Sequence, residues 1–362
     1  EPAWQCKLPS SPTAPIVVGD WVFLAAKDAH ALYALSRKTG KIAWSFVADG
    51  RIDSPPTYYK GLLLFGCRGG WAYAIRAKDG VPAWKFNDLP AQRLISARGQ
   101  FESAWPVSGN VMVHGDVAYF AAGRQTFIDG GIVLYGLDPL TGDVLYRRQV
   151  CGPYDQNGFP RIRRLSGIPQ IEGFKSGIFT TENGLLYIRH QAFRPDLTPV
   201  AMEKLRDDHL IASAGFLDDT PQHRTYWSID TDLRYGPATG INSPGPQGDV
   251  VAVDGEVFYE IRGYYPGRHG QLRPGGGYAL YSGAKSVASW RPPRKGKPVQ
   301  LDTVVPLSRK WERRWTTQIP LSGHALIVAG DTIVAAGVPM ETSFDDAALS
   351  SSFAGERGGR IW

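Results

Sequence analysis

A nine-residue phrase that ends on an aromatic residue occurs three times in the first half of the chain, and its recurrence limits the fold more than any other feature. It reads SRKTGKIAW at 36–44, RAKDGVPAW at 76–84 and DPLTGDVLY at 138–146. Each copy follows a short run of alternating apolar residues, which is typical of a half-buried strand. Because the middle of each copy carries turn-forming residues and a glycine, the phrase predicts a strand, a tight turn and a second strand.

A second repeated feature lies upstream, where a glycine turn leads into another apolar strand. Four short strands in each repeat of about 40–50 residues is the pattern of a β-propeller, in which each blade buries an apolar face on the next. The sequence therefore predicts an all-β fold, a β-propeller of four-stranded antiparallel blades, with six blades readable and seven expected when complete, within a range of about 6 to 8. The six turns are marked by the lead glycines Gly19, Gly61, Gly115, Gly184, Gly255 and Gly330.

The repeats predict one β-propeller over residues 1–362. Both ends look incomplete in this pattern. The stretch GGRIW at 358–362 resembles the beginning of a third strand, and AWQCKL at 3–8 resembles the last strand of a blade. We therefore expect the chain to be a fragment or a processed piece of a longer protein.

The apolar run, the Thr-Gly-Lys type of turn and the closing tryptophan resemble the PQQ-like, or quinoprotein alcohol dehydrogenase-like, β-propeller repeat family. Other stretches resemble uncharacterised multidomain propeller proteins of planctomycete-type bacteria: DAHALYAL at 28–35, GRIDSPPT at 50–57, FESAWPV at 101–107 and HRTYW at 223–227. The resemblance implies that the aromatic residue docks between neighbouring blades. That role falls to Trp44 and Trp84, which we expect to be largely buried, and to Tyr146, where the chain departs from the pattern and where a tryptophan should be tolerated.

The lengths of the connections differ between the two faces of such a blade. In each blade, the turns between the first and second strands and between the third and fourth strands emerge on one face, which we call the short-turn face. The connections between the second and third strands and between successive blades emerge on the opposite face, which we call the long-loop face. Long ordered loops in a compact domain are usually functional, so we expect a binding surface on the long-loop face. A basic segment at 285–300 is expected as a solvated loop on the short-turn face. The long segments are 87–104, 123–131, 151–168, 191–208, 263–276 and 338–357.

The long-loop face is predicted to carry many arginines and few acidic residues. The planar guanidinium suits carboxylate, sulfate or phosphate groups, so the partner would be a protein or an anionic glycan. Equally, these arginines would hold the long loops on the blades. The residues expected to bind the ligand are Arg98, Arg124, Arg194, Asp218 and Arg268.

Two classes of function follow from these features. The first is an exported binding or scaffold module whose ligand or partner lies on the long-loop face. The alternative is a glycan-active enzyme, such as a polysaccharide lyase on an acidic glycan, with a base, an acid and a carboxylate clamp drawn from His190, His223, Arg224 and Tyr226. His30 is expected to form a hydrogen bond between blades instead.

Charge and hydropathy limit the partners and the location. A formal charge of +6 is weak for phosphate-driven binding, so we expect no nucleic-acid partner. The sequence has no apolar run long enough for a transmembrane segment. Since the first residues do not form a signal peptide, we expect a periplasmic or extracellular protein whose targeting segment has been removed.

The cysteines bear on the cofactors. Cys6, Cys67 and Cys151 are too far apart for a disulfide framework or a zinc site, although one disulfide stays possible. Quinone-dependent dehydrogenases of the family that the repeats resemble carry a vicinal cysteine pair and an acidic calcium site, and the sequence has neither. It also lacks a Cys-x-x-Cys-His motif for haem. We therefore expect no PQQ, no haem and no metal.

Overall fold

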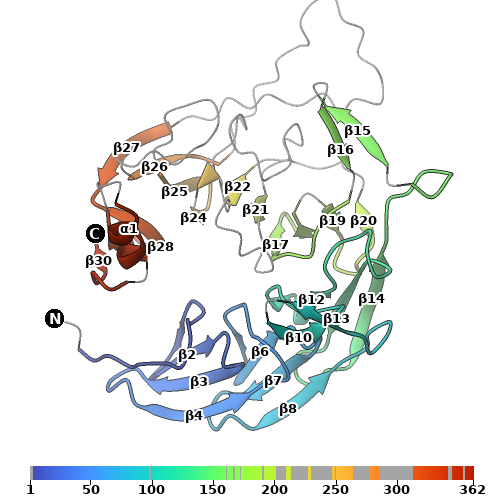
Figure 1. Ribbon diagram of the computed structural model, residues 1–362, viewed down its shortest axis with the longest axis horizontal. Helices are drawn as coiled ribbons and strands as arrows, with labels where there is room; N and C mark the ends of the chain where they lie inside the picture. Colours follow the sequence, from blue (N-terminus) through green and yellow to red (C-terminus); the bar gives the residue numbers. More distant parts are fainter. Residues whose placement is uncertain are drawn as a thin grey trace, which may run out of the picture. The chain divides into compact units, whose positions relative to one another are not determined.

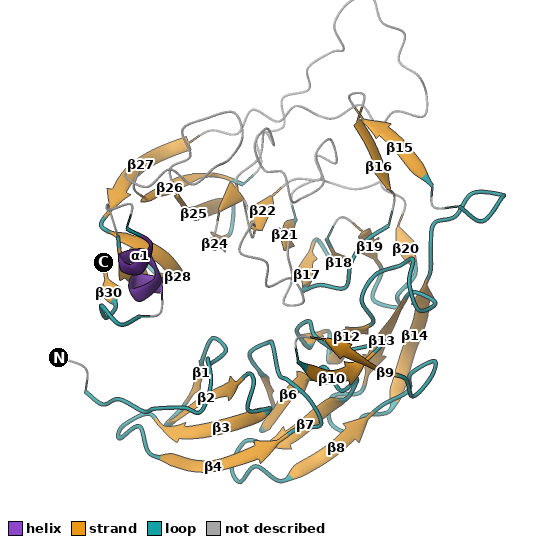
Figure 2. Ribbon diagram, viewed as in Figure 1, coloured by secondary structure: helices purple, strands orange, loops and turns teal. Residues whose placement is uncertain are grey.

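The computed structural model is built almost entirely of β-strands (Figures 1 and 2). Its one described helix is α1 (Asp346–Phe353), and no helix in the described part of the chain is long and apolar enough to cross a membrane. The described residues are 3–97, 99–159, 161–165, 168–171, 173–189, 191–200, 209–212, 227–229, 247–248, 250–263, 278–285, 313–340, 345–353 and 355–362. The chain forms two compact units, the first of Glu1–Arg163, Pro169–Met202 and Gly215–Asp219, and the second of Arg164–Ile168, Glu203–Ala214 and Thr220–Trp362.

The first unit contains four antiparallel four-stranded blades. The first blade consists of β1 (Ile16–Val18), β2 (Trp21–Ala26), β3 (Ala31–Ser36) and β4 (Ile42–Val47). The second consists of β5 (Thr57–Tyr59), β6 (Leu62–Gly66), β7 (Ala72–Arg76) and β8 (Pro82–Phe86). The third consists of β11 (Met112–His114), β12 (Val117–Ala122), β13 (Ile132–Leu137) and β14 (Val144–Val150). The fourth consists of β17 (Phe179–Glu182), β18 (Leu185–Ile188), β19 (Gln191–Phe193) and β20 (Pro199–Val200).

Two hairpins lie in the connections between these blades. The hairpin of β9 (Leu94–Ala97) and β10 (Gln100–Ser103) precedes the third blade, and that of β15 (Ile162–Leu165) and β16 (Ile168–Ile171) precedes the fourth. The second unit holds a four-stranded blade of β24 (Val250–Asp254), β25 (Val257–Gly263), β26 (Tyr278–Ala284) and β27 (Arg313–Ile319). It also holds two three-stranded sheets, β21 (Leu210–Ala212), β22 (Trp227–Ile229) and β23 (Gln247–Gly248), and β28 (Leu321–Ala329), β29 (Thr332–Pro339) and β30 (Arg360–Ile361).

All six lead glycines lie where the sequence predicted them, in a two-residue turn between the first two strands of a sheet. The register of the second blade, Tyr59↔Leu62, is typical, and the turn residues Lys60 and Gly61 have φ of 44° and 88°. Positive φ at both positions matches the right-handed twist of the strands, and glycine adopts it without strain. The predicted β-propeller class with its six readable blades is confirmed.

Each blade of the first unit has two apolar faces because side chains alternate along a strand. In β6, Leu63 and Phe65 belong to the core shared with the first blade, whereas Leu64 belongs to the core shared with the third. A third core joins the third and fourth blades through residues such as Tyr119 and Phe179. Burial of these side chains between sheets, and not any single sheet, stabilises the unit.

The closing aromatic of the repeated phrase contacts the next blade. The indole Nε1 of Trp44 donates a hydrogen bond to the Ala77 carbonyl at 3.1 Å, and the ring lies over Gly80, where a Cβ atom would come within 2.7 Å of it. Trp84 makes the same contact one blade later, with the Pro139 carbonyl at 3.0 Å and with Gly142. Each copy of the phrase therefore supplies both partners of this contact. Its tryptophan packs on the following blade, and its glycine receives the tryptophan of the preceding blade.

The same contact begins at the N-terminal segment. Trp4 donates from its Nε1 to the Arg37 carbonyl at 2.7 Å and covers Gly40. Residues 3–8 do not form a strand, so the predicted last strand is wrong as a strand although its tryptophan keeps the docking contact. Trp44 and Trp84 are half-buried, less than we expected.

The contact changes between the third and fourth blades. The turn between β19 and β20 in the fourth blade is one residue shorter than the turns between the third and fourth strands of the other blades. Leu197, which is fully buried and has a φ of 64°, stands where those turns have glycine. The Pro195 carbonyl of this turn accepts a hydrogen bond at 2.8 Å from the hydroxyl of Tyr119, and Tyr146 packs against the same core. Leu197 thus replaces the glycine over which a tryptophan ring lies in the other turns, and the tolerance of a tryptophan at position 146 stays a prediction.

Two sequence assignments need correction. The segment 191–208 is not a long loop, because its first ten residues form β19, a tight turn and β20. The interval between Gly184 and Gly255, which the pattern of lead glycines counts as one repeat, contains the additional sheet β21–β23. Short strands with few apolar alternations explain why the pattern did not show them.

Gly80→Ala should destabilise the protein more than Gly61→Ala. Both glycines have positive φ, so both changes carry the cost of placing an alanine there, about 1 kcal/mol. Only at Gly80 does the new Cβ collide with Trp44, which should add about 1–3 kcal/mol, whereas at Gly61 nothing lies within 4 Å. Urea denaturation of the two variants measures the difference, and equal losses would mean that the tryptophan does not constrain this turn.

Candidate functional site

Three long connections of the first unit are tied together on the long-loop face. The guanidinium of Arg93, before β9, forms an ion pair with Asp129 in the loop between β12 and β13. The loop after β14 joins them, since the Gly152 amide donates to the Thr126 carbonyl at 2.8 Å. The three loops therefore form one ordered surface.

This surface exposes large apolar side chains. Leu94 and Phe101 on the β9–β10 hairpin are 64% and 75% exposed, and Phe159 in the loop after β14 is 68% exposed. The register Phe101↔Ser96 and Ser103↔Leu94 places Leu94 and Phe101 on the same side of the hairpin. We call Leu94, Phe101, Ile128, Tyr154 and Phe159 the apolar loop surface.

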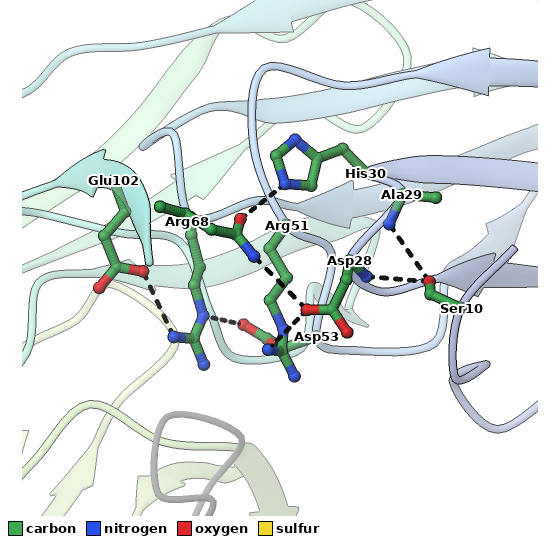
Figure 3. Close-up of polar contacts among 9 residues, drawn as sticks. Ser10, Asp28, Ala29, His30, Arg51, Asp53, Arg68 and Glu102 are labelled. Atoms are coloured by element: carbon green, nitrogen blue, oxygen red, sulfur yellow. Dashed lines mark hydrogen bonds and ion pairs between the residues drawn. The ribbon is translucent and has the colours of Figure 1, made fainter. Parts of the chain in front are cut away.

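A network of alternating charges lies beneath the hairpin (Figure 3). Arg51 donates to Asp28 at 2.9 Å and to Asp53 at 2.8 Å. Arg68, which follows β6, donates to the other oxygen of Asp53 at 2.5 Å and to Glu102 of β10 at 3.3 Å. The network therefore joins the first blade to the second and reaches the hairpin.

Glu102 extends the network to the third blade. Its second carboxylate oxygen accepts a hydrogen bond from Arg124, which follows β12. The side chains of Asp53, Arg68 and Glu102 are at most 4% exposed. Burial disfavours the charge on Arg68, but the carboxylates of Asp53 and Glu102 outweigh it and hold the pKa of the guanidinium above its ordinary value.

The two described residues among the predicted ligand-binding residues lie on different faces. Arg124 lies on the long-loop face, and its contact with Glu102 matches the alternative that these arginines hold loops in place. Arg194 lies in the turn between β19 and β20, on the short-turn face, so its assignment to the long-loop face is wrong. The turn was mistaken for a loop because its strands are only two and three residues long.

The other candidates lie outside the described residues: Arg98, Asp218 and Arg268 for ligand binding, and His190, His223, Arg224 and Tyr226 for catalysis. His30 is described, and its Nε2 lies 2.7 Å from Oε1 of Gln100 on β10. The imidazole therefore forms a hydrogen bond to a residue beyond its own blade.

The charged network was not found from the sequence, although two signals were present. An arginine follows the second strand by one or two residues in successive blades, as Arg68, Arg124 and Arg189 show, and a charged residue precedes a buried serine in each connection. These signals are single residues about 50 to 70 positions apart. Only the stacking of the blades shows that they meet.

None of the three cysteines takes part in a disulfide. Cys67 is buried between the first two blades, where burial raises the pKa of its thiol to about 11. It is free, as are Cys6 and Cys151. In the described part of the chain no group of three or more His, Cys, Asp or Glu side chains gathers to hold a metal ion.

Comparison of the sequence with known proteins gives matches to BamB proteins. A PQQ-type family model described as outer membrane protein assembly factor BamB matches residues 1–196, more than half of the chain. The BamB protein of Moranella endobia (strain PCIT) is 32% identical over 82 residues, 23% of this chain and 20% of that protein. The BamB protein of Burkholderia pseudomallei (strain K96243) is 26% identical over 148 residues, 40% of this chain and 34% of that protein. The chain thus spans about a fifth to a third of the length of these relatives.

Solved structures similar to this chain include BamB from Moraxella catarrhalis, at 11% identity and a TM-score of 0.47 over 94% of this chain and 84% of that one. A europium-containing methanol dehydrogenase has 12% identity and a TM-score of 0.45 over 91% of this chain and 83% of that one.

Glu102→Gln should destabilise the fold strongly. It removes one buried carboxylate and leaves Arg68 and Arg124 short of a charged partner, a change that typically costs about 3–5 kcal/mol. Asp79→Asn is the matched control, because Asp79 pairs with Arg76 on the exposed short-turn face and its loss should change stability little. Thermal unfolding monitored by circular dichroism compares them, and similar melting temperatures would contradict a structural role for the network.

Proposed function

This chain belongs to the family of outer membrane protein assembly factor BamB, and we propose from this that it is a binding and scaffold propeller that holds a protein partner on its long-loop face. The membership confirms the resemblance to PQQ-like repeat proteins. The family name also supports an exported protein of the bacterial cell envelope, on the periplasmic side of an outer membrane. The chain's role in a complete assembly is part of the proposal, because the chain covers only part of its relatives.

The observation that carries the proposal is the apolar loop surface. Leu94, Phe101 and Phe159 are more than half exposed on loops that are tied to one another, and exposed apolar patches are typical of protein interfaces. The base is rigid because ion pairs and backbone hydrogen bonds join the three loops. A protein partner that covers Leu94, Phe101 and Phe159 would bury this surface.

The apolar character of this surface favours a protein over an anionic glycan. A glycan site would require exposed cationic and polar groups, whereas Arg93 and Arg124 on this face are paired with Asp129 and Glu102. No described residue favours the lyase alternative, since its four candidate residues lie outside the described part of the chain.

Photo-crosslinking in the producing bacterium tests the partner face. A photoreactive phenylalanine analogue in place of Phe101 or Leu94 should crosslink to the same protein of the outer-membrane assembly machinery. The control position is Val47 at the end of β4, which is apolar and 70% exposed but lies off the three loops. A contact through the loop surface predicts adducts at 94 and 101 and none at 47.

Two results would contradict this proposal. Adducts of equal yield at position 47 would indicate unspecific contact, and a well-folded protein without adducts at 94 and 101 would show that the surface is free in the cell. Circular dichroism of each substituted protein establishes that it is folded.

We also propose that the protein works without a quinone cofactor. Incubation with PQQ and Ca²⁺ should give no stable quinone absorbance after gel filtration and no oxidation of alcohols or sugars with an artificial electron acceptor. The physical reason is the donor set, since Cys67 is a lone buried thiol and the buried carboxylates of Asp53 and Glu102 are paired with arginines. Reconstituted dehydrogenase activity would overturn this expectation.

A further inference from the structure

The β9–β10 hairpin, which carries part of the apolar loop surface, shows in which direction its backbone groups point. The amide of Ala104, just after β10, donates to the Arg93 carbonyl at 2.9 Å. The next amide back, that of Ser103, points away from β9 and donates to the Arg68 carbonyl at 2.8 Å. Hydrogen-bonded and non-hydrogen-bonded pairs alternate along an antiparallel ladder, so Leu94, which lies opposite Ser103, belongs to a non-hydrogen-bonded pair.

The same alternation fixes the direction of every backbone group of β9. Ile95 and Ala97 form hydrogen bonds to β10, whereas the N–H and C=O groups of Leu94 and Ser96 point away from β10. In the described part of the chain, no other strand pairs with β9 and no group forms a hydrogen bond to these outward groups. The outer edge of β9 therefore presents two donors and two acceptors.

This edge lacks the features that protect the outer strands of the four blades in the first unit. β4, β8 and β14 each face a break in the register of the neighbouring strand, and β20 begins with a proline. Bulges, prolines and charged side chains prevent an exposed edge from pairing with another chain. β9 reads Leu-Ile-Ser-Ala, without proline or charge, and its register with β10 is unbroken.

The side chains beside the edge are apolar on the solvent side. Cross-strand partners share a face of the hairpin, so Leu94 and Ser96 lie on the same face as Phe101. All three are exposed, whereas Ile95 is half-buried and Glu102 is buried on the opposite face. A strand added to β9 would place every second side chain next to Leu94 and Ser96, on the apolar face that Phe101 extends.

The hairpin is also held in place before any partner arrives. Glu102 pairs with Arg68 and Arg124, and the side chain of Gln100 lies 2.7 Å from Nε2 of His30. A partner that binds an edge already in its extended conformation does not have to order that edge on binding.

We propose that the protein partner binds β9 as an added β-strand, an extended segment whose backbone pairs with Leu94 and Ser96 and whose alternate apolar side chains cover the exposed face of the hairpin. The occupant is an extended polypeptide because donors and acceptors that recur at every second residue match the backbone of another strand. A helix has its backbone groups bonded internally and does not match them. This inference rests on the proposed protein-binding function and specifies how the partner is held.

The first test measures, by anisotropy, the binding of a fluorescent peptide of alternating valine and threonine with lysine at both ends. The control peptide carries methyl groups on two adjacent backbone amides, which point to opposite edges of an extended chain. The unmethylated peptide should bind and the methylated one should not, because each edge of the methylated peptide has lost a donor. Equal binding of the two peptides would overturn the inference.

Two substitutions at one position separate the backbone from the side chain. The Ser96 N–H points away from β10, so Ser96→Pro removes an outward donor without breaking the β9–β10 ladder. It should weaken binding of the peptide about tenfold or more, whereas Ser96→Ala keeps the N–H and should stay within about twofold of the unmodified protein. Circular dichroism establishes that both variants are folded, and equal affinities of the two folded variants would contradict strand addition.

Hydrogen exchange of the unmodified protein gives a second readout that needs no variant. In the free protein, the amides of Leu94 and Ser96 should exchange about tenfold or more faster than those of Ile95 and Ala97, which are bonded to β10. Saturation with the valine–threonine peptide should slow exchange at Leu94 and Ser96 by about tenfold or more. Unchanged exchange at both amides in the presence of bound peptide would show that the peptide does not pair with this edge.

Crosslinking from position 101 separates this inference from the proposed function. A weaker adduct in Ser96→Pro than in Ser96→Ala supports both. Adducts of equal yield to the same protein in the two variants leave the proposed function standing and overturn strand addition. An unmodified protein that forms no adduct in the cell, but whose Leu94 and Ser96 amides are protected by the peptide, would contradict the proposed function and support the strand edge as a peptide site.

Discussion

The contact of a tryptophan ring with the backbone of a glycine in the next blade is the constraint on which the first unit depends. A ring at van der Waals distance leaves no space for a Cβ at Gly40, Gly80 or Gly142, and the indole N–H requires the carbonyl of the same turn. These two demands fix the separation and the rotation of successive blades. The apolar cores between the blades then form in a single register.

The charged network is a second connection between the same blades, on the opposite face. The charged network differs from the tryptophan contact because buried charges stabilise the fold only while every charged partner is in place. The two connections end at the same interface, where Tyr146 and Leu197 replace the tryptophan and the glycine, and Lys175 replaces the acid. The interface between the third and fourth blades is held by its apolar core, by the Tyr119 hydroxyl and by hydrogen bonds such as those that the Asn110 side chain exchanges with the Phe179 backbone.

The sequence predicted much of the fold and little of the candidate site. Periodic turns and alternating strands are local, so the lead glycines and the first three blades followed from the pattern. The short strands β19 and β20 carry too few residues for alternation to show, and Arg194 was therefore assigned to the wrong face. Seven predicted site residues lie outside the described chain, whereas the exposed Phe101 was part of a stretch noticed only for its family resemblance.

The sequence by itself determined the repeat and the two-residue turns, because these depend on backbone conformation, and its family resemblance implied that the closing aromatic docks on the next blade. The tertiary structure alone decided which charges meet. Arg68, Glu102 and Arg124 are separated by 34 and 22 residues, and no local preference brings them together. They meet because stacked blades superpose the ends of equivalent strands, which turns single residues of distant repeats into one buried network.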